Sequence, residues 1–423
     1  MNLMRAYYQV VRNKGGAGVD GMKVSELYDH LQTHREGIKE SIRSGSYLPQ
    51  PIRGVEIPKS NGKKRLLGVP TVVDRMLQQA LGQILCNNYD MDFEDNSYGF
   101  RPKRSAHQAV RRSLEYINSG NIYIVDIDLK TFFDEVDHCS LLQLLYRKVK
   151  CRQSLRLIRK WLRAPIQLNG KLVKRRKGVP QGSPLSPILS NILLDELDKE
   201  LNVMGVKYVR YADDFSIYCQ EERQSQEVQE LIYRFQKDKL HLPINEEKSG
   251  IRTPEEFTIL GYSFERSSED SEQSDYHLIV SAKRWKTLKE KLKEVTRKTL
   301  PYTFDMRMIK LKEIQRGWVQ YFCLAKIHWQ LKNLDKWVRN RIRYCIWHSW
   351  KKPKRRCKSL IRIGIKPHIA RSWSHTRMGG WATARSPILT TTITMARLRR
   401  RGYQSMTTVY ESIAPHLNEP LYT

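Results

Sequence analysis

The segment Lys207–Gln220 reads KYVRYADDFSIYCQ, and its pattern predicts two short strands joined by a tight turn at Tyr211-Ala212-Asp213-Asp214. Two adjacent carboxylates at a hairpin tip repel each other, and a pair of divalent cations would remove that repulsion. An Asp-Asp pair alone is weak support for a site, because such dipeptides are common in surface turns. The turn predicts a metal site only if a carboxylate from another part of the chain joins it.

An upstream strand can supply that carboxylate. Asn121–Leu129 (NIYIVDIDL) is rich in β-branched residues, and the period of two places Asp126 and Asp128 on one face. In two-metal phosphoryl transfer, carboxylates converge from separate elements on ions about 3.5–4 Å apart. We therefore expect Asp128 to pair with Asp213 and Asp214 across a sheet, and Asp126 is the alternative assignment.

A third segment lies between these two in the chain. It reads GVPQGSPLSPILSNI, and apolar residues recur at helical spacing from Ser186 onward. Pro184 and Pro187 lie where the start of a helix tolerates a missing amide donor. The order is thus a strand aspartate, a helix opened by QGSPLSP, and a YADD hairpin. This combination is far more specific than any of its three parts.

The N-terminal region contains a second hairpin signal. Pro49–Pro70 alternates short β-like runs with a turn at Asn61-Gly62, and Lys59 and Arg65 near the turn make the hairpin basic. On composition alone this would be a solvated, charged hairpin. Gly16–Gly21 matches G-x-G-x-x-G, but the segment before it has the pattern of an amphipathic helix, so we interpret the match as a loop.

The charge is concentrated near the C-terminus. The chain has a formal net charge of +31, and the part from Ala282 onward holds 33 Lys or Arg against 7 Asp or Glu, a net +26. Such a field attracts polyanions, most commonly nucleic acid, with an anionic membrane as the alternative. No apolar run approaches the roughly 18 residues of a membrane span, which disfavours the membrane.

The N-terminal sequence and the cysteine spacing indicate the cellular compartment. The N-terminus MNLMRAYYQVVRNK has no apolar signal core, so we expect a cytoplasmic protein. The seven cysteines are widely spaced and form no CxxC, which is typical of reduced thiols and argues against a zinc site.

The order of the three central motifs resembles the palm of reverse transcriptases. The resemblance implies that Asp128, Asp213 and Asp214 are catalytic residues that bind two Mg²⁺ ions. It also implies that Phe133, five residues after Asp128, is a steric gate whose ring fills the space of a ribose 2′-hydroxyl. The alternative is that Phe132 and Phe133 are simply core residues.

The same resemblance implies roles for residues around the nucleotide. Gln181 and Gly182 would lie against the incoming nucleotide and template, where a small residue permits close backbone approach. Lys59 and Arg65, with Arg53, would grip the triphosphate. Lys248, in INEEKS, would protonate the pyrophosphate leaving group, or else is an ordinary surface lysine.

More specifically, the chain resembles the reverse transcriptase and maturase proteins of bacterial group II introns over nearly its full length. SYGFRPKRSAHQAV at Ser97–Val110 and the GVPQGSPLSPILSNI and YADD segments are dense matches, and RIRYCIWHSWKKPK from Arg341 resembles the maturase segment. Longer family members carry a C-terminal zinc endonuclease, which the missing CxxC pairs argue against here. The resemblance implies intron RNA contacts at Arg341, Arg343, Lys351, Lys352, Lys354, Arg355 and Arg356.

We therefore expect an α+β, right-hand polymerase. Residues 1–49 would form an N-terminal extension, 50–276 the fingers and a palm with an antiparallel sheet, and 277–423 a basic, helical thumb and maturase (X) region that binds RNA. The resemblance implies an RNA-directed DNA polymerase that also assists intron splicing and mobility. Alternatives are a non-catalytic RNA-binding splicing cofactor, or an RNA-directed RNA polymerase, which Phe133 disfavours.

The expected partners follow from this reading. They are an RNA template and primer duplex, structured group II intron RNA, target DNA and deoxynucleoside triphosphates, within a bacterial cytoplasmic ribonucleoprotein and without a membrane.

Overall fold

The structure, a computed structural model, describes residues 1–58, 62, 64–267 and 275–413. The chain forms two compact units, Met1–Phe257 and Thr258–Thr423. The first unit mixes helices with two sheets, and the second joins a small antiparallel sheet to a set of helices. The expected α+β class with a helical C-terminal region is confirmed, whereas the expected functional division after residue 276 stays a prediction.

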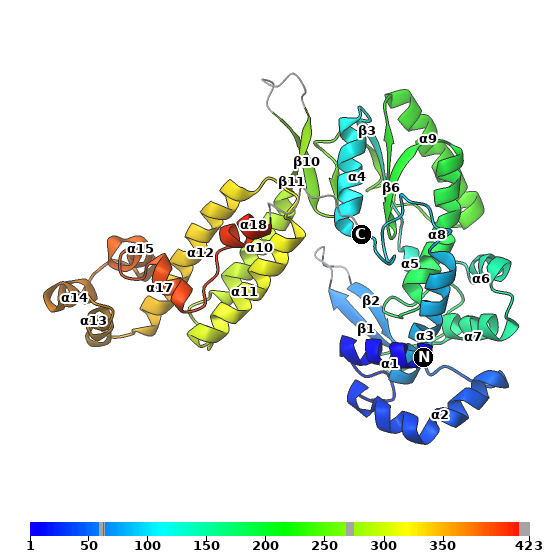
Figure 1. Ribbon diagram of the computed structural model, residues 1–423, viewed down its shortest axis with the longest axis horizontal. Helices are drawn as coiled ribbons and strands as arrows, with labels where there is room; N and C mark the ends of the chain where they lie inside the picture. The colour runs from blue at the N-terminus through cyan, green and yellow to red at the C-terminus, as the bar shows by residue number, and fades with distance from the viewer. Residues whose placement is uncertain (59–61, 63, 268–274, 414–423) are drawn as a thin grey trace. The chain divides into compact units, whose positions relative to one another are not determined.

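The first unit alternates helices and strands (Figure 1). As expected, Gly16–Gly21 is a loop rather than part of a nucleotide-binding strand and helix. The helices are α1 (Asn2–Asn13), α2 (Leu27–Arg43), α3 (Val72–Tyr89), α4 (Ala106–Asn118), α5 (Phe132–Glu135), α6 (His138–Lys148), α7 (Arg152–Arg163), α8 (Ser186–Val203) and α9 (Glu222–Phe235), with a short 3₁₀ turn, η1 (Val24–Glu26), and a π-helical turn, η2 (Gln236–Leu240). The strands are β1 (Ile52–Pro58), β2 (Lys64–Val69), β3 (Tyr123–Asp128), β4 (Ile166–Leu168), β5 (Lys171–Val173), β6 (Lys207–Tyr211), β7 (Asp214–Cys219) and β8 (Gly250–Arg252).

One sheet of this unit contains both predicted aspartate segments. Its order is β6-β7-β3-β8, and each neighbouring pair is antiparallel. Helices α4, α8 and α9 pack against it. Helix α8 begins at Ser186 with a proline in its first turn, as the QGSPLSP pattern predicts. The predicted strand and YADD hairpin therefore lie side by side in one sheet.

The second sheet has the order β2-β1-β4-β5. Strands β1 and β2 form the predicted antiparallel hairpin, although Asn61 in its turn lies outside the described residues. Strand β4 runs parallel to β1, and β4 and β5 form a hairpin that we did not predict. Its turn, Asn169-Gly170, has positive φ at both residues (50° and 80°), so the Asn-Gly signal that identified the first hairpin would have found this one too.

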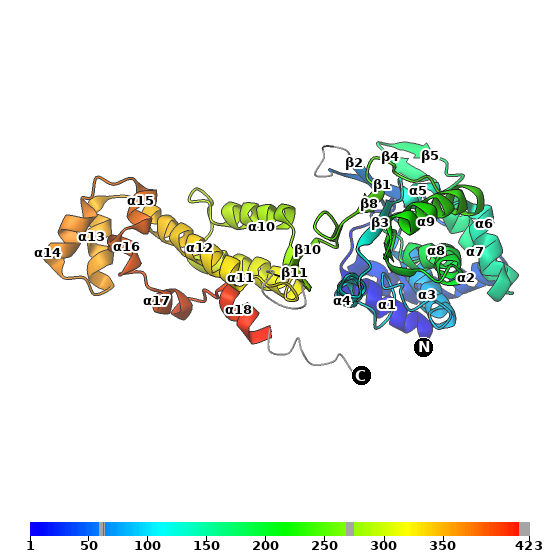
Figure 2. The same ribbon diagram turned by 90° about the horizontal axis from the view of Figure 1, so that it is seen from above.

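In the second unit, a three-stranded antiparallel sheet of order β11-β10-β9 is followed by helices. Helix α10 packs on α11, and α18 packs on both α11 and α12 (Figure 2). Among the helices of the described residues, none is both long and apolar enough to cross a membrane. The elements are β9 (Thr258–Ile259), β10 (Tyr262–Arg266), β11 (Tyr276–Val280), α10 (Ala282–Val295), α11 (Phe304–Tyr321), α12 (His328–Ser349), α13 (Pro353–Arg362), α14 (Pro367–Ser374), α15 (Gly380–Arg385), α16 (Pro387–Thr390), α17 (Met395–Arg400) and α18 (Met406–Ile413).

Candidate active site

Three of the predicted aspartates meet at one end of the β6-β7-β3-β8 sheet. In the pairing of β3 with β7, Asp128 lies directly opposite Asp214. Asp213 precedes Asp214 in the turn between β6 and β7, where Ala212 adopts a left-handed conformation with φ of 61°. The period of two in β3 and the tight YADD turn thus bring carboxylates from two strands together.

The electrostatics of these carboxylates show mutual repulsion. Although the Asp214 residue reaches solvent, burial of its carboxyl, together with the neighbouring charges of Asp213, Asp128 and Asp126, raises its pKa to about 6. Burial also raises the pKa of Asp213, and Arg65 opposes that change. Negative charge is therefore concentrated at this end of the sheet, and a bound cation would relieve it.

The loop before β8 wraps around Asp128. Its carboxylate Oδ2 accepts hydrogen bonds from Lys248 Nζ at 2.9 Å and from Asn245 Nδ2 at 2.8 Å, and its backbone amide donates to Ser249 Oγ at 3.0 Å. Asn245 and Ser249 were not predicted. They could have been predicted from the sequence only because they lie close to Lys248 in the chain.

Asp126, the alternative to Asp128, already has a cation partner within the sheet. Its Oδ2 lies 3.0 Å from Arg252 Nε, and Arg252 also donates to the carbonyl of Lys248 at 2.6 Å. Burial raises the pKa of Asp126, while the neighbouring guanidinium opposes that rise. The Arg252 side chain is only 34% exposed, whereas the Lys248 partner of Asp128 is 64% exposed, so Asp128 is the carboxylate whose cation partner is more easily displaced.

The residues present suit a divalent cation. Among the residues that the structure describes, no three Asp, Glu, His or Cys side chains converge closely enough to hold an ion as they stand. Mg²⁺, however, prefers carboxylate oxygens, retains several waters, and is commonly held by one or two carboxylates together with substrate phosphates. Asp128, Asp213 and Asp214 supply donors of this kind, so the set fits Mg²⁺ without a closed cage of protein ligands.

A second group of predicted residues lies beside the carboxylates. The Arg65 guanidinium, on β2, donates to the side chain of Gln181. The amide of Gly68 donates to the Gln181 carbonyl at 2.7 Å, which docks the 181–182 turn on β2. Gly182 has a φ of 108°, and a Cβ there would lie 2.7 Å from the Gly68 carbonyl oxygen, so this position requires glycine.

For the remaining predicted substrate-binding residues, the structure gives less direct support. The exposed Arg53, on β1, donates to the carbonyl of Ala17 at 3.3 Å. Lys59 lies outside the described residues. Phe133 is only 8% exposed and meets Phe132 edge-on, with ring centroids 5.2 Å apart. Both rings belong to the core, and the gate assigned to Phe133 stays a prediction.

The basic residues predicted near the C-terminus divide into two groups. The Arg343 guanidinium is buried and donates to the carbonyl of Ile393 at 3.0 Å, so it does not fit the phosphate contact that we expected. Arg341 is half-buried and bonds to Thr296 Oγ1 at 2.5 Å. The two arginines lie on different sides of α12, and each bonds to a different segment packed against that helix. Lys351, Lys352, Lys354 and Arg355 are exposed, and the half-buried Arg356 lies over the Trp347 ring at 4.4 Å.

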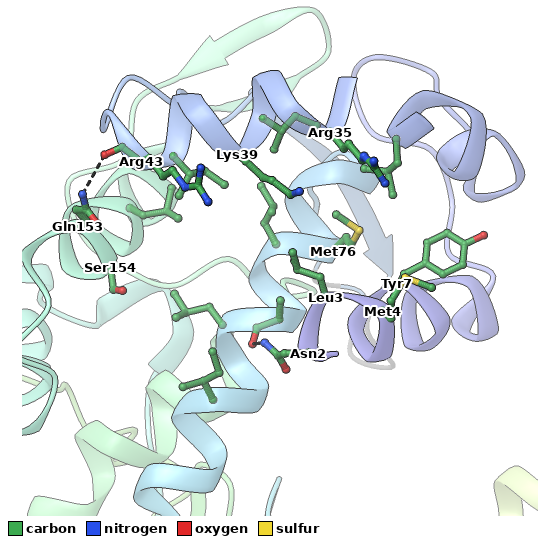
Figure 3. Close-up of a pocket in the computed structure, with 18 of the residues that line it drawn as sticks. Asn2, Leu3, Met4, Tyr7, Arg35, Lys39, Arg43, Met76, Gln153 and Ser154 are labelled. Carbon is green, nitrogen blue, oxygen red and sulfur yellow. Dashed lines mark hydrogen bonds between the residues drawn. The ribbon is translucent and has the colours of Figure 1, made fainter. Parts of the chain in front are cut away.

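An apolar pocket of about 560 Å³ lies among α1, α2, α3 and α7 of the first unit (Figure 3). Leu3, Met4 and Met76 line it, and Arg35 and Lys39 lie at its edge. None of the carboxylates described above contributes to its lining, so it is not part of the candidate active site.

Comparisons with known proteins agree with this geometry. The family model for reverse transcriptase (RNA-dependent DNA polymerase) matches residues 57–264. The model for the group II intron maturase-specific domain matches residues 285–362. The first unit thus carries the polymerase domain of a reverse transcriptase. The residues 57–264 and 285–362 thus belong to the reverse transcriptase and group II intron maturase families, and this pair of domains supports a group II intron-encoded reverse transcriptase and maturase.

Individual relatives match slightly less than half of the chain. It is 38% identical over 206 residues to the group II intron-encoded protein LtrA of Lactococcus lactis subsp. cremoris, covering 48% of this chain and 34% of LtrA. It is 37% identical over 189 residues to YkfC of Escherichia coli (strain K12), covering 44% of this chain and 50% of YkfC. Each match thus covers half or less of the length of the relative.

Among solved structures, the telomerase of Candida albicans has a TM-score of 0.46 at 14% identity, with 79% of this chain and 65% of that chain covered. A likeness of this size supports no conclusion about function.

Proposed function

We propose that this chain is an RNA-directed DNA polymerase that copies RNA into cDNA by two-metal phosphoryl transfer and also binds group II intron RNA. The observation that carries the proposal is the pairing of Asp128 with Asp214, beside Asp213. Carboxylates that meet from two strands, with a phosphate-binding cation beside them, are what transfer of a nucleotidyl group needs. Arg65 supplies that cation.

The carboxylates Asp128, Asp213 and Asp214 would hold two Mg²⁺ ions. Bound there, the ions would clamp the attacking and leaving oxygens and neutralise the charge that develops between them. The Arg65 guanidinium has the forked geometry that binds phosphate oxygens. The exposed ammonium of Lys248 carries a proton that it can give to the pyrophosphate leaving group.

Neighbouring residues would select the nucleotide. Without a side chain at Gly182, the 181–182 turn can approach the incoming nucleotide and the template closely, and Gln181 faces them. Phe133 is assigned to exclusion of the ribose 2′-hydroxyl. Arg53 and Lys59 are further cations of this basic segment, and they would help to hold the triphosphate.

Intron RNA would bind the second unit. The exposed cations Lys351, Lys352, Lys354 and Arg355 follow α12 or lie in α13, and RNA is held largely through phosphate and 2′-hydroxyl contacts. The maturase-specific match covers these residues. We propose splicing assistance and target DNA binding, within a ribonucleoprotein, as the roles of this contact.

Primer extension tests the polymerase half of the proposal. Purified full-length chain, with Mg²⁺ and a DNA primer annealed to an RNA template, should incorporate deoxyribonucleotides, and the Asp213→Asn variant should not. Equal use of ribonucleotides would instead indicate an RNA polymerase. Binding of the duplex without extension would indicate the non-catalytic RNA-binding cofactor.

A further inference from the structure

A fully buried ion pair lies beneath the turn that presents Asp213 and Asp214. Arg210, in β6, and Asp198, in α8, both have side chains with 0% exposure. Arg210 Nε lies 2.8 Å from Asp198 Oδ1 and 3.0 Å from Oδ2. Removing two charges from water costs free energy that their attraction offsets only when the other polar atoms are also paired. The other hydrogen bonds of the Arg210 guanidinium therefore indicate the role of this ion pair.

Every N–H group of the Arg210 guanidinium has a partner. Besides Asp198, Nη2 donates to Ser97 Oγ at 2.7 Å, and Nη1 donates to Asn191 Oδ1 at 3.1 Å and to the Ala212 carbonyl at 2.9 Å. A guanidinium has five donors in a fixed fork, and all five are used here. The last of these bonds reaches the backbone of the YADD turn itself.

Ala212, whose carbonyl accepts the hydrogen bond from Arg210, is in a conformation that a non-glycine residue seldom adopts. Ala212 has a φ of 61°, and such backbone persists only where its surroundings fix it. Gly99 lies against the same residue, because a Cβ at Gly99 would be 2.2 Å from the Ala212 amide nitrogen. The Gly99 carbonyl accepts a hydrogen bond from Asn191 Nδ2 at 2.9 Å. The turn is thus bonded by Arg210 and packed by Gly99.

The loop that contains Gly99 is itself bound along β6. The amide of Arg210 donates to the Asn96 carbonyl, and the amide of Tyr98 donates to the Arg210 carbonyl, both at 2.9 Å. Helix α8, this loop and the turn therefore form one hydrogen-bonded unit around the Arg210 side chain.

We propose that Arg210 is a positioning residue that, with Gly99 packed against Ala212, fixes the YADD backbone so that Asp213 and Asp214 can share a divalent cation with Asp128. The inference rests on the proposed function for the identity of the site, but it concerns cation binding and not turnover. Without the hydrogen bond from Arg210 to Ala212, the carboxylates would be present but wrongly placed.

The test measures binding of Mn²⁺, a spectroscopic substitute for Mg²⁺, to the full-length chain by electron paramagnetic resonance. Arg210→Lys keeps a positive charge near Asp198 but, with three donors on a single nitrogen, cannot reproduce the fork. Gly99→Ala leaves the ion pair intact and displaces the turn. We expect each variant to bind Mn²⁺ about tenfold more weakly, and Asp213→Asn to lose binding at this site.

A matched control separates positioning from general destabilisation. Asp74→Asn changes another buried carboxylate, which accepts hydrogen bonds from Tyr47 at 2.8 Å and Trp161 at 2.9 Å. It should lower the melting temperature while leaving Mn²⁺ affinity unchanged, with all measurements made well below each variant's melting temperature. Since Gly99→Ala perturbs the turn by another route, a failure of Arg210→Lys to fold leaves the test intact.

The outcomes distinguish the two proposals. Wild-type Mn²⁺ affinity in folded Arg210→Lys or folded Gly99→Ala overturns the positioning role, as does a wild type with no Mn²⁺ binding that depends on Asp213. A wild type that binds Mn²⁺ through Asp213, with weaker binding in both variants, yet extends no primer, supports the positioning role and overturns the polymerase proposal.

Discussion

The ammonium of Lys248 lies 2.9 Å from Oδ2 of the Asp128 carboxylate. Nearly two thirds of the Lys248 side chain is exposed, so the ammonium can leave this partner without uncovering a buried charge. The lysine thus supplies positive charge at the end of β3. Under the proposed function, a cation held by Asp128 would compete with the Lys248 contact for the same carboxylate.

This competition gives the first prediction. Lys248→Met should bind Mn²⁺ severalfold more tightly than wild type, because Asp128 no longer has a cation partner, and yet it should extend primers more slowly, because the proton donor is missing. Affinity is measured by electron paramagnetic resonance and rate by single-turnover extension. Lys239→Met, which removes another exposed lysine, is the control. Unchanged Mn²⁺ affinity in Lys248→Met would contradict the competition.

A second prediction separates the two strand aspartates. Asp128→Asn should slow primer extension by at least about a hundredfold, because a bound ion contributes several kcal/mol of charge stabilisation in the transition state. Asp126→Asn should have a smaller effect, since Arg252 already neutralises that carboxylate. Affinity for the RNA–DNA duplex should be nearly the same in both variants. If Asp126→Asn has the larger effect, the assignment of Asp128 is wrong.

The third prediction concerns pH. The raised pKa of Asp214, about 6, means that the folded protein binds a proton there more tightly than the unfolded chain does. This contribution to stability is fully present below the usual carboxyl pKa and is lost as the pH rises through about 6. Without metal, the melting temperature of wild type should therefore fall relative to Asp214→Asn between pH 4 and 7. If the melting temperatures of wild type and Asp214→Asn change in parallel between pH 4 and 7, the pKa of Asp214 is not raised. Added Mg²⁺ should offset the loss above pH 6.

The fourth prediction compares Phe133, which is assigned to exclusion of the ribose 2′-hydroxyl, with its neighbour Phe132. Phe133→Ala should admit ribonucleotides, because a steric conflict excludes a hydroxyl more strongly than the absence of one hydrogen bond, which typically changes binding by about 1 kcal/mol. Both Phe132→Ala and Phe133→Ala remove a core ring and should destabilise the protein by about 3–5 kcal/mol. Only Phe133→Ala should change the ratio of ribonucleotide to deoxyribonucleotide incorporation. The same change in both variants would trace it to poorer packing of the core.

The sequence predicted those features that local patterns encode. The period of two in β3, the YADD turn and the prolines that open α8 follow from backbone geometry over a few residues, and the structure has each of them. The pairing of Asp128 with Asp214 could also be expected, because two strands with carboxylates at adjacent ends can form one sheet.

Contacts between distant residues were not predictable in this way. The side-chain partners of Arg210 and Asp126 lie 12 to 126 positions away in the chain, and no local pattern specifies them. Arg343 shows the same limit, because the maturase resemblance implied an RNA contact there, whereas packing with the segment at Ile393 buries it. Whether a charged residue faces solvent depends on which elements cover its helix.

The last prediction concerns the exposed cations after α12. Of the seven cations predicted to contact RNA, Arg343 is buried, Arg341 bonds to Thr296 and Arg356 lies over Trp347. The four that are exposed are Lys351, Lys352, Lys354 and Arg355. Replacing these four with Gln should weaken binding of folded group II intron RNA. The slope of log affinity against log salt should also fall by roughly 0.7–0.9 for each RNA phosphate that the protein no longer neutralises. Extension of a short, pre-annealed primer should change much less, because the carboxylate site is untouched.

A charge-matched control decides whether this contact is specific. Replacing the exposed lysines Lys171, Lys174, Lys237 and Lys239 with Gln removes the same net charge from the first unit. Filter-binding titrations at physiological salt compare both variants with wild type on folded intron RNA and on an unstructured RNA of equal length. A specific contact predicts a large decrease in affinity only for the variant at residues 351–355, and only with folded RNA. Equal decreases in the two variants, or equal affinity of wild type for the two RNAs, would leave these cations as a nonspecific polybasic surface and remove the proposal that they recognise the intron.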